Sequence, residues 1–345
     1  MTVRRVVVHK AGSYDRLAIE TRPSREPAPG QITIDVEAIG VNYADVVVRM
    51  GLYASAREKV GWPITPGFEV AGRVREVGDG VTGLAVGDRV IAVTLFDGYA
   101  TEVTVPRAQV FALPAALGFG AGAAIPAVYL TAYFALHHLA HPRKGDRVLV
   151  HSAAGGVGSC LVQLAKLAGC EVVGVVGSAH KVEAARALGC DHVIDKSSED
   201  LWARARSLSD RGYDVVLDAN GVETLKQSYV HTRPAGKLVV YGFATMMPKT
   251  GGRPNYLKLA ADYLRTPRFN PLDMTNDSKS VLAFNLSYLF DRTDILEEGM
   301  AAIMGWLAAG AITPPVVTRY PFDRVADAHR DIESGKTVGK LVLIP

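Results

Sequence analysis

Short apolar runs rich in Val, Ile and Thr fill the first third of the 345-residue chain. Turn clusters such as 27–30 and 78–80 separate these runs. This spacing predicts a compact, barrel-like β domain rather than a repeat of strands and helices. One helix, 42–50, interrupts the β pattern. The predicted strands are 6–8, 31–38, 70–77, 89–93 and 100–106.

The hydrophobic rhythm changes at about residue 126, where apolar strands begin to alternate with helices. The first of these helices carries Val157, Leu161 and Leu164 at helical spacing. This alternation predicts an α/β fold with a doubly wound parallel sheet of the Rossmann type. The predicted strands are 147–152, 171–176, 192–194, 214–218 and 237–242, and the helices between them are 157–168, 180–188, 199–208 and 222–231.

The first strand of this region ends in a small-residue turn, in the sequence RVLVHSAAGGVG at 147–158. Gly155 would let the backbone approach a pyrophosphate, and the helix N-terminus would face its negative charge. Gly158 would let the helix pack close to the sheet. Turns need glycine for structural reasons alone, and Ala153 replaces the first glycine of the usual triplet. We predict that a dinucleotide binds through Ala154, Gly155, Gly156 and Val157.

The chain after residue 243 has a less regular pattern. Segment 248–272 carries five Lys or Arg residues against one Asp, which fits a solvated flap better than a helix on a membrane surface. Segment 281–290 predicts a long apolar strand, and an exposed strand of this kind favours pairing across a homodimer. Helix 294–309 and a final strand that returns to the first domain complete the prediction.

Composition argues against several classes of protein. The chain has 38 basic and 35 acidic residues, so no overall field favours nucleic acid. Segment 108–142 is uncharged, but its prolines and glycines leave no clean run of the roughly 20 residues that a membrane span needs. Its helices should therefore be buried. The three cysteines lack metal or redox spacing, and the first residues lack a signal-peptide pattern. We expect a soluble, cytoplasmic protein without a transmembrane segment.

Several separate motifs together resemble one protein family. They are G-V-N-x-x-D at 40–45, R-x-G-L-Y at 49–53, P-G-x-E at 66–69, A-A-G-G-V-G at 153–158 and G-K-x-V-L at 339–343. From about residue 6 to residue 345, the chain resembles the medium-chain dehydrogenase/reductase superfamily, and within it the zinc-independent quinone oxidoreductases, which include the zeta-crystallins. YGFATMM and FNLSYLF are further similar to segments of the vesicle amine transport protein homologues.

The resemblance implies a discontinuous layout. A GroES-like catalytic domain would comprise 1–126 and 290–345, and a Rossmann dinucleotide-binding domain, 127–289, would be inserted in it. Related zinc alcohol dehydrogenases place metal ligands where this chain has Asn42 and Phe68. Phenylalanine cannot donate to zinc, so we expect no metal. Glu69 is then interpreted as a paired strand residue. The histidines at 137, 138 and 141 could bind a metal by their spacing, although a wet helix end is the favoured interpretation.

The end of the second Rossmann strand indicates which cofactor binds. An NAD enzyme normally places Asp or Glu there to hold the ribose hydroxyls, yet 172–182 contains no acid. Ser178 can instead hydrogen-bond a 2′-phosphate, and Lys181 can neutralise it. The alternative is an ordinary helix-capping Ser followed by a surface Lys. The quinone oxidoreductases that this chain resembles use Ser and Lys here for the phosphate, so we predict NADPH.

The resemblance also assigns polar residues near the nicotinamide. Asn42 and Tyr53 would be the catalytic pair, although Asn42 could simply cap a helix and Tyr53 could simply pack. Asp45 is expected to tether this loop without transferring a proton. Val47 replaces an aromatic residue found in some relatives, which leaves the shape of the substrate pocket open. The other cofactor contacts implied are Tyr129, Asn220, Gly242, Phe243, Asn285 and Lys340; Tyr129 could instead be buried in an apolar helix.

No catalytic triad or carboxylate pair is evident in the sequence, so the reaction should need no strong protein acid or base. Hydride transfer from NADPH to a quinone or an α,β-unsaturated carbonyl fits this, with Asn42 and Tyr53 orienting the reactants and water supplying the proton. Two alternatives stay open. One is an enoyl-thioester reductase in which Tyr53 helps to protonate the substrate. The other is an NADPH-binding structural or interaction protein with little turnover.

Overall fold

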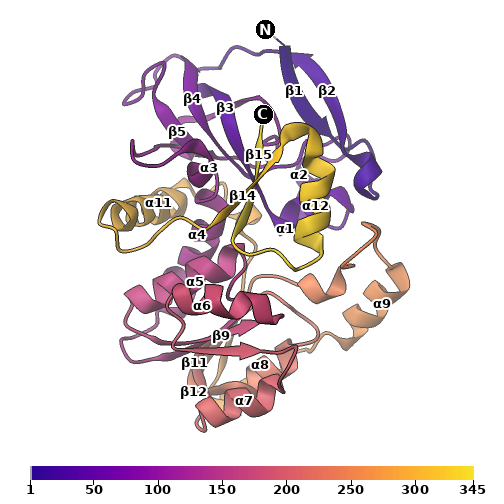
Figure 1. Cartoon of the computed structure of the whole chain (residues 1–345), viewed down its shortest axis with the longest axis vertical. Coiled ribbons are helices and arrows are strands. Elements are labelled where there is room, and N and C mark those ends of the chain that lie inside the picture. Colours follow the sequence, from indigo (N-terminus) through magenta and orange to yellow (C-terminus); the bar gives the residue numbers. More distant parts are fainter. Residues whose placement is uncertain (1) are drawn as a thin grey trace. The chain divides into compact units, whose positions relative to one another are not determined.

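The computed structural model describes residues 2–345, and this described chain divides into two compact units. The first unit combines the chain up to Leu130 with Lys249–Arg253 and Leu286–Pro345. The second unit comprises Thr131–Pro248 and Pro254–Asn285. Each unit therefore contains stretches that are far apart in the sequence (Figure 1).

A mostly antiparallel sheet forms the first unit, and within residues 2–345 it has seven strands in the order β14-β15-β3-β4-β5-β7, with β6 also paired to β3. A separate ribbon of β1 and β2 lies outside this sheet. The strands are β1 (Thr2–Val7), β2 (Ala18–Pro23), β3 (Gln31–Val41), β4 (Glu69–Val77), β5 (Arg89–Val93), β6 (Glu102–Pro106), β7 (Val110–Ala112), β14 (Val317–Pro321) and β15 (Lys340–Ile344).

Strand β3 organises this sheet because it pairs with β4, β6 and β15. Buried Val36 alternates with exposed Asp35 and Glu37, as expected of a strand with one face toward a core. The register with β4 shifts at two places, which bends the sheet. At one bend a Cβ on Gly72 would lie 2.0 Å from the Asp35 carbonyl oxygen, so only glycine fits there.

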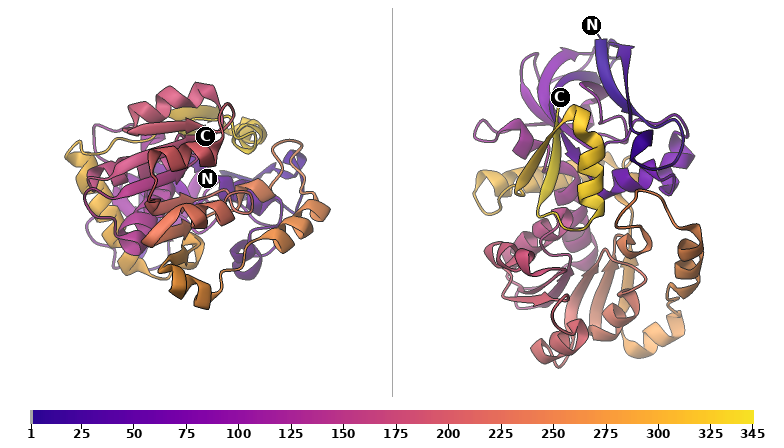
Figure 2. Two further views of the ribbon diagram at one scale, coloured as in Figure 1. Left: turned by 90° about the horizontal axis from the view of Figure 1, so that it is seen from below. Right: turned by 45° about the vertical axis from the view of Figure 1, so that its right-hand side comes forward.

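The C-terminal segment closes the first unit. Strand β15 pairs antiparallel with β3, so the final strand does return to the first domain, as the sequence predicted. Helix α12 (Val325–Glu333) lies beside β14 and β15 (Figure 2). The other helices of this part are α1 (Tyr43–Arg49), α2 (Ala54–Lys59), α3 (Phe119–Gly122), α4 (Pro126–Tyr133) and α11 (Thr293–Ala308).

The second unit is a doubly wound Rossmann fold. Within the described chain its sheet has six parallel strands in the order β10-β9-β8-β11-β12-β13, and helices α5–α8 connect five of them (Figure 1). This confirms the predicted fold class. The elements are β8 (Arg147–His151), α5 (Gly156–Leu167), β9 (Glu171–Val176), α6 (Val182–Ala187), β10 (His192–Asp195), α7 (Leu201–Leu208), β11 (Tyr213–Asp218), α8 (Leu225–His231), β12 (Thr232–Val240) and β13 (Ser280–Ala283).

The prediction of a long strand over 281–290 is wrong. Strand β13 ends at Ala283, at the edge of the sheet, and a 3₁₀ turn follows at Leu286–Tyr288. The polar side chains in the run explain why it stops. Ser287 is buried against Ser55, whose hydroxyl lies 2.8 Å away, and the Tyr288 hydroxyl donates to Glu58. Both partners lie on α2, a helix that the sequence reading missed.

The basic segment 248–272 is partly helical. Within it lies helix α9 (Tyr256–Arg265), and α10 (Pro271–Asp277) follows. Asn255 caps α9 by accepting from the Lys258 N–H. Leu257 and Leu264 are 86% and 77% exposed, and the Lys258 ammonium donates to the Thr245 carbonyl at 2.7 Å.

One helical run in the described chain is long and apolar enough to cross a membrane. It spans Phe119–Ala140, and 78% of its most apolar window is buried inside the protein. Burial of this kind is typical of a core helix, as the prolines and glycines of the segment had indicated.

A buried ion pair joins helices α1 and α12 of the first unit. Arg49 on α1 and Glu333 on α12 are both fully buried, with Nη2 and Oε2 2.9 Å apart. Glu333 also accepts from the Tyr14 hydroxyl and from the Gly252 N–H. The Arg49 guanidinium further donates to the Gly252 carbonyl and lies over the Tyr14 ring.

We predict that Glu333→Gln lowers the free energy of unfolding by about 3–5 kcal/mol, because it leaves the Arg49 charge buried without its counter-ion. Urea denaturation followed by fluorescence measures this change. Glu297→Gln, at an exposed position on α11, is the matched control and should change stability by less than about 0.5 kcal/mol. Equal effects of the two substitutions would contradict the prediction.

Candidate functional site

The turn between β8 and α5 is shaped by two close approaches to the Ser152 carbonyl oxygen. A Cβ on Gly158 would lie 2.1 Å from this oxygen, and one on Gly155 would lie 3.2 Å from it. Glycine at 158 therefore lets α5 begin directly against the end of the strand. Gly155 is the N-cap, and the helix starts at Gly156. The first N–H groups of α5 have no partner within the helix, so Gly156 and Val157 form a cradle suited to an anion.

Ala153, which replaces the first glycine of the triplet, is accommodated by the neighbouring strand. It is fully buried, and a Cβ on Gly174 of β9 would lie 2.9 Å from the Ala153 methyl group. Gly174 thus leaves the space that this methyl group fills. The departure from the usual triplet does not obstruct the turn.

The end of β9 carries Ser178 and Lys181. Ser178 is the N-cap of the 3₁₀ turn Ala179–Lys181, yet within residues 2–345 its side chain makes no capping hydrogen bond. The helix-capping alternative therefore lacks its characteristic contact. Burial lowers the pKa of Lys181, so its ammonium group is partly desolvated. Sequence reading missed Lys196, whose Cε would lie 3.7 Å from a Cβ placed on Gly177. Its position directly after β10 was the available signal.

Asn220 follows β11 and links the ends of two neighbouring strands. Its Oδ1 accepts from the Ser152 hydroxyl at 3.2 Å, and its Nδ2 is buried with no hydrogen-bond partner among residues 2–345. Such a donor is costly unless something accepts from it. The loop is held by Asp218, a fully buried residue that accepts from the N–H groups of Asn220 and Gly221. Sequence reading had given Asp218 no role.

Gly242 and Phe243 follow β12 at the same edge of the sheet. A Cβ on Gly242 would lie 2.9 Å from the Ala219 carbonyl oxygen, and one on Gly221 would lie 2.7 Å from the Phe243 ring. Phe243 is 43% exposed. The turn, Ser178, Lys181, Asn220 and Phe243 therefore all lie at the carboxyl ends of parallel strands, where such sheets bind ligands.

In the first unit, Asn42 belongs to a buried polar cluster with Glu69 and Lys340. The Lys340 ammonium lies 2.6 Å from Glu69 Oε1 and also donates to Asn42 Oδ1. Asn42 Nδ2 donates to Glu69 Oε1 at 2.9 Å, and the Ala127 N–H donates to Oε2 at 2.7 Å. Glu69 is thus a paired strand residue, as the sequence suggested. Lys340 is 3% exposed, and its charge is balanced within the cluster.

Asp45 tethers the same loop. It is fully buried and accepts from the N–H groups of Asn42 and Gly67, both at 2.8 Å, and from the Tyr99 hydroxyl at 3.1 Å. Burial, opposed by these hydrogen bonds, raises the pKa of Asp45 to about 7. His329 lies 3.1 Å from the Tyr99 hydroxyl, and burial holds the pKa of His329 well below its usual value.

Tyr53 packs into an aromatic cluster with Phe68 and Phe96. The centroid of the Tyr53 ring lies 5.8 Å from that of the Phe68 ring and 6.4 Å from that of the Phe96 ring. Phe68 stands at the position of a zinc ligand in the related alcohol dehydrogenases, and here it is 6% exposed and packed 5.3 Å from Phe96. Apolar packing thus occupies the place of a metal donor. Val47 is only partly buried on α1.

The remaining predicted contacts have different surroundings. Tyr129 is fully buried, and its hydroxyl donates to the Thr313 carbonyl at 2.6 Å, which agrees with the alternative of simple burial. Asn285 follows β13 and is half-buried, outside any strand. His137 and His138 stack on Tyr133 and Phe134.

A zinc ion does not fit the residues at 42, 68 and 69. Phe68 has no donor atom, and the amide of Asn42 is engaged by Lys340 and Glu69. Across residues 2–345, no group of three His, Cys, Asp or Glu side chains is placed to hold a metal ion.

Two family models match the chain. One, described as the alcohol dehydrogenase GroES-like domain, matches residues 28–138, and one described as zinc-binding dehydrogenase matches residues 188–343. The human synaptic vesicle membrane protein VAT-1 homolog is 35% identical over 345 residues, which cover 99% of this chain and 86% of that protein. The chain belongs to the medium-chain dehydrogenase/reductase superfamily. Within it, a 2-haloacrylate reductase from a Burkholderia species is 32% identical, with 99% of each chain covered.

Solved structures of this superfamily have the same fold. A mycobacterial protein, Rv1454c, complexed with NADPH superposes with a TM-score of 0.86 at 30% identity, covering 99% of this chain and 100% of that one. Escherichia coli quinone oxidoreductase complexed with NADPH gives 0.84 at 28% identity, with both chains fully covered. The CurK enoyl reductase gives 0.84 at 27% identity, with 99% of each chain covered. The family resemblance found in the sequence is therefore confirmed.

We predict that the stability of the protein relative to an Asp45→Asn variant falls by about 2 kcal/mol between pH 5 and pH 8. The folded pKa of Asp45, about 7, exceeds its unfolded value of roughly 3.9, so the folded state binds the extra proton between these values. Stability from Asp45 is therefore complete below roughly pH 4 and is lost progressively as the pH rises from there through 7. Urea denaturation of both proteins at the two pH values measures the difference. A difference that does not change with pH would disprove the raised pKa.

Proposed function

We propose that this protein is an NADPH-dependent reductase that transfers hydride to quinones or α,β-unsaturated carbonyls without zinc. The observation that carries the proposal is the edge of the Rossmann sheet. There the Ser178 hydroxyl makes no capping hydrogen bond within residues 2–345, Lys181 is partly desolvated, and 172–182 contains no acid. A 2′-phosphate would accept from the Ser178 hydroxyl and attract the Lys181 ammonium, whereas the ribose hydroxyls of NADH carry no charge for Lys181 to balance.

The rest of the second unit fits the other parts of such a cofactor. The cradle at Gly156 and Val157 would hold the pyrophosphate, with Ala154 and Gly155 leading into it. The orphaned Asn220 Nδ2 would donate to an acceptor on the nicotinamide side, and Gly242 and Phe243 would border it. We assign these contacts to NADPH because two superfamily members of known structure are complexed with it.

The first unit would position the substrate rather than supply a strong acid. The ammonium of Lys340 is bound by Glu69, and Asp45 is enclosed by two backbone N–H groups and Tyr99. Neither group is arranged to give up a proton to a substrate. When bound, NADPH supplies a hydride. Asn42 and Tyr53 would orient the acceptor carbonyl or quinone, and water would deliver the proton.

A second candidate is an enoyl-thioester reductase. Tyr53 favours it, because this side chain carries a phenol within an otherwise apolar cluster and could protonate the carbon next to a thioester. The similarity to the CurK enoyl reductase is compatible with this reaction. A third possibility, an NADPH-binding interaction protein, is suggested by the name of the VAT-1 homologues.

Steady-state oxidation of NADPH with 9,10-phenanthrenequinone and with crotonyl-CoA separates these functions. We expect turnover with the quinone. Turnover with crotonyl-CoA alone would favour the thioester reductase. Tight NADPH binding without turnover of either substrate would contradict both enzymes and favour the interaction protein.

Lys181→Ala should weaken NADPH binding by about 1–3 kcal/mol and leave NADH binding nearly unchanged, because only NADPH carries the 2′-phosphate. Calorimetric titration with each cofactor measures both effects. Lys226→Ala, on the exposed surface of α8, is the matched control and should alter neither affinity. Equal losses of affinity for the two cofactors would contradict the assignment of Lys181 to the 2′-phosphate.

Tyr53→Phe tests how the substrate is protonated. If water delivers the proton to a quinone, kcat with phenanthrenequinone should change less than about threefold, since the aromatic packing is kept. A loss on the order of 100-fold with crotonyl-CoA would show general-acid catalysis by the phenol. A comparable large loss with the quinone would overturn the role given to water.

A further inference from the structure

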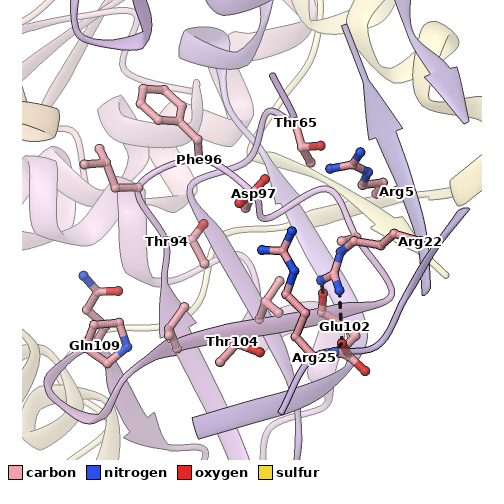
Figure 3. Close-up of a pocket in the computed structure, with 15 residues that line it drawn as sticks. Arg5, Arg22, Arg25, Thr65, Thr94, Phe96, Asp97, Glu102, Thr104 and Gln109 are labelled. Atoms are coloured by element: carbon pink, nitrogen blue, oxygen red, sulfur yellow. Dashed lines mark hydrogen bonds and ion pairs between the residues drawn. The ribbon is translucent and has the colours of Figure 1, made fainter. Parts of the chain in front are cut away.

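A pocket of about 280 Å³ lies in the first unit, lined by side chains from the β1–β2 ribbon, the loop 94–97 and β6 (Figure 3). We call it the arginine pocket, because Arg5, Arg22 and Arg25 all line it. Thr65 and Asp97 also belong to the polar part of its wall. It contains none of the residues assigned above to NADPH or to substrate.

One carboxylate of the pocket is already neutralised. Glu102 is 2% exposed, and its carboxylate is paired with both Arg22 and Arg75. Arg22 also donates to the Glu102 carbonyl oxygen at 3.3 Å, and the Ser24 hydroxyl donates to Oε2 at 2.5 Å. The guanidinium of Arg22 is therefore committed to the protein. An occupant of the pocket would have to be held by the other polar groups.

Arg25 offers the pocket an uncompensated positive charge, and Arg5 offers an unpaired N–H donor. The Nε of Arg5 is buried and donates to no acceptor within residues 2–345, while its Nη2 forms a long ion pair with Glu20 Oε2 at 4.0 Å. The Arg25 side chain forms no ion pair in the described chain, although its backbone N–H reaches Glu102. Asp97 is the second carboxylate that lines the pocket. The three arginines of the wall outnumber its two carboxylates, so the lining carries a net positive charge.

Thr65 supplies a second orphaned group in the same wall. It is 3% exposed, and its Oγ1 has no hydrogen-bond partner among the described residues. Figure 3 shows Thr65 beside the Arg5 guanidinium. Each buried polar group left unpaired costs about 1–3 kcal/mol. The Thr65 hydroxyl and the Arg5 Nε–H are two such groups, and both residues line this cavity. An oxygen acceptor in the cavity would satisfy both donors.

We propose that the arginine pocket is a second ligand site, which binds an oxyanion, either a carboxylate or a phosphate group. Guanidinium groups match the geometry of both oxyanions and bind them with two parallel hydrogen bonds. The volume lies just below the roughly 300–1,000 Å³ of sites for drug-sized ligands, so the oxyanion would be free or carried on a small organic group. Leu95, Val103 and Val105 provide the apolar wall for such a group.

The loop that forms one wall is held in a costly conformation. Phe96 and Asp97 have φ angles of 69° and 60°, in the left-handed region that non-glycine residues rarely adopt. The Asp97 N–H donates to the Thr65 carbonyl at 2.9 Å, which ties the loop to the orphaned threonine. This conformation directs the Phe96 ring into the cluster with Tyr53 and Phe68 and away from the arginines (Figure 3). The pocket thus shares one loop with the aromatic cluster.

Calorimetric titration and thermal unfolding of the full chain test this site, with inorganic phosphate and benzoate as probes at constant ionic strength in chloride. We expect millimolar or tighter binding of at least one probe, and the preferred probe distinguishes a phosphate site from a carboxylate site. Thr65→Val and Arg25→Gln should each weaken it at least fivefold, because each removes a donor to the anion. Arg206→Gln, an exposed arginine on α7, is the matched control and should bind like the parent protein.

The Arg25 side chain is exposed and forms no ion pair in the described chain, so the Arg25→Gln variant should fold. This variant therefore keeps the test decisive. Thermal shifts no larger than those with chloride would overturn the proposal. Equal binding to Arg25→Gln and to the parent would overturn it too, since it would place the anion elsewhere. NADPH titration of each variant should be unchanged, so the outcome does not depend on the proposed reductase activity.

Discussion

The buried ion pair of Glu69 and Lys340 is the interaction on which the first unit depends. It joins β4 to the C-terminal strand, and through Asn42 and the Ala127 N–H it also holds the beginnings of α1 and α4. Removing one partner of such a pair typically costs about 3–5 kcal/mol, because the other charge stays buried. A Cβ on Gly40 would lie 2.3 Å from Glu69 Oε1, so glycine there makes room for the carboxylate.

This polar cluster and the aromatic cluster beside it replace a metal centre. Asn42 is held by its neighbours, and Phe68 packs against Phe96 and Tyr53. The loop between them is tethered by Asp45, whose acceptor oxygens are occupied by backbone N–H groups and Tyr99. The polar groups of this cluster are therefore bound to one another, and the aromatic side chains are packed together. These properties suit a reaction in which the cofactor supplies the reducing equivalents.

Much of the second unit could be predicted from local pattern. The strand, turn and helix around Gly155 and Gly158 follow from neighbouring residues in the sequence, as does the alternation that gives a parallel sheet. The prediction failed where a run of apolar residues contained polar ones with distant partners. Ser287 pairs with Ser55, more than 200 positions earlier, and no local pattern reveals that contact. The same is true of Gly174, which makes space for the unusual Ala153.

The sequence by itself determined the fold class, the superfamily, the phosphate-binding turn and the loss of the zinc ligands. These properties depend on residue types at fixed spacing, and that spacing can be read directly from the sequence. Only the tertiary structure decided that Lys340 is neutralised by Glu69, that Tyr129 is buried against Thr313, and that Arg5 and Thr65 line one pocket. Charge balance and unpaired donors depend on which distant segments meet, and a linear pattern does not contain that information.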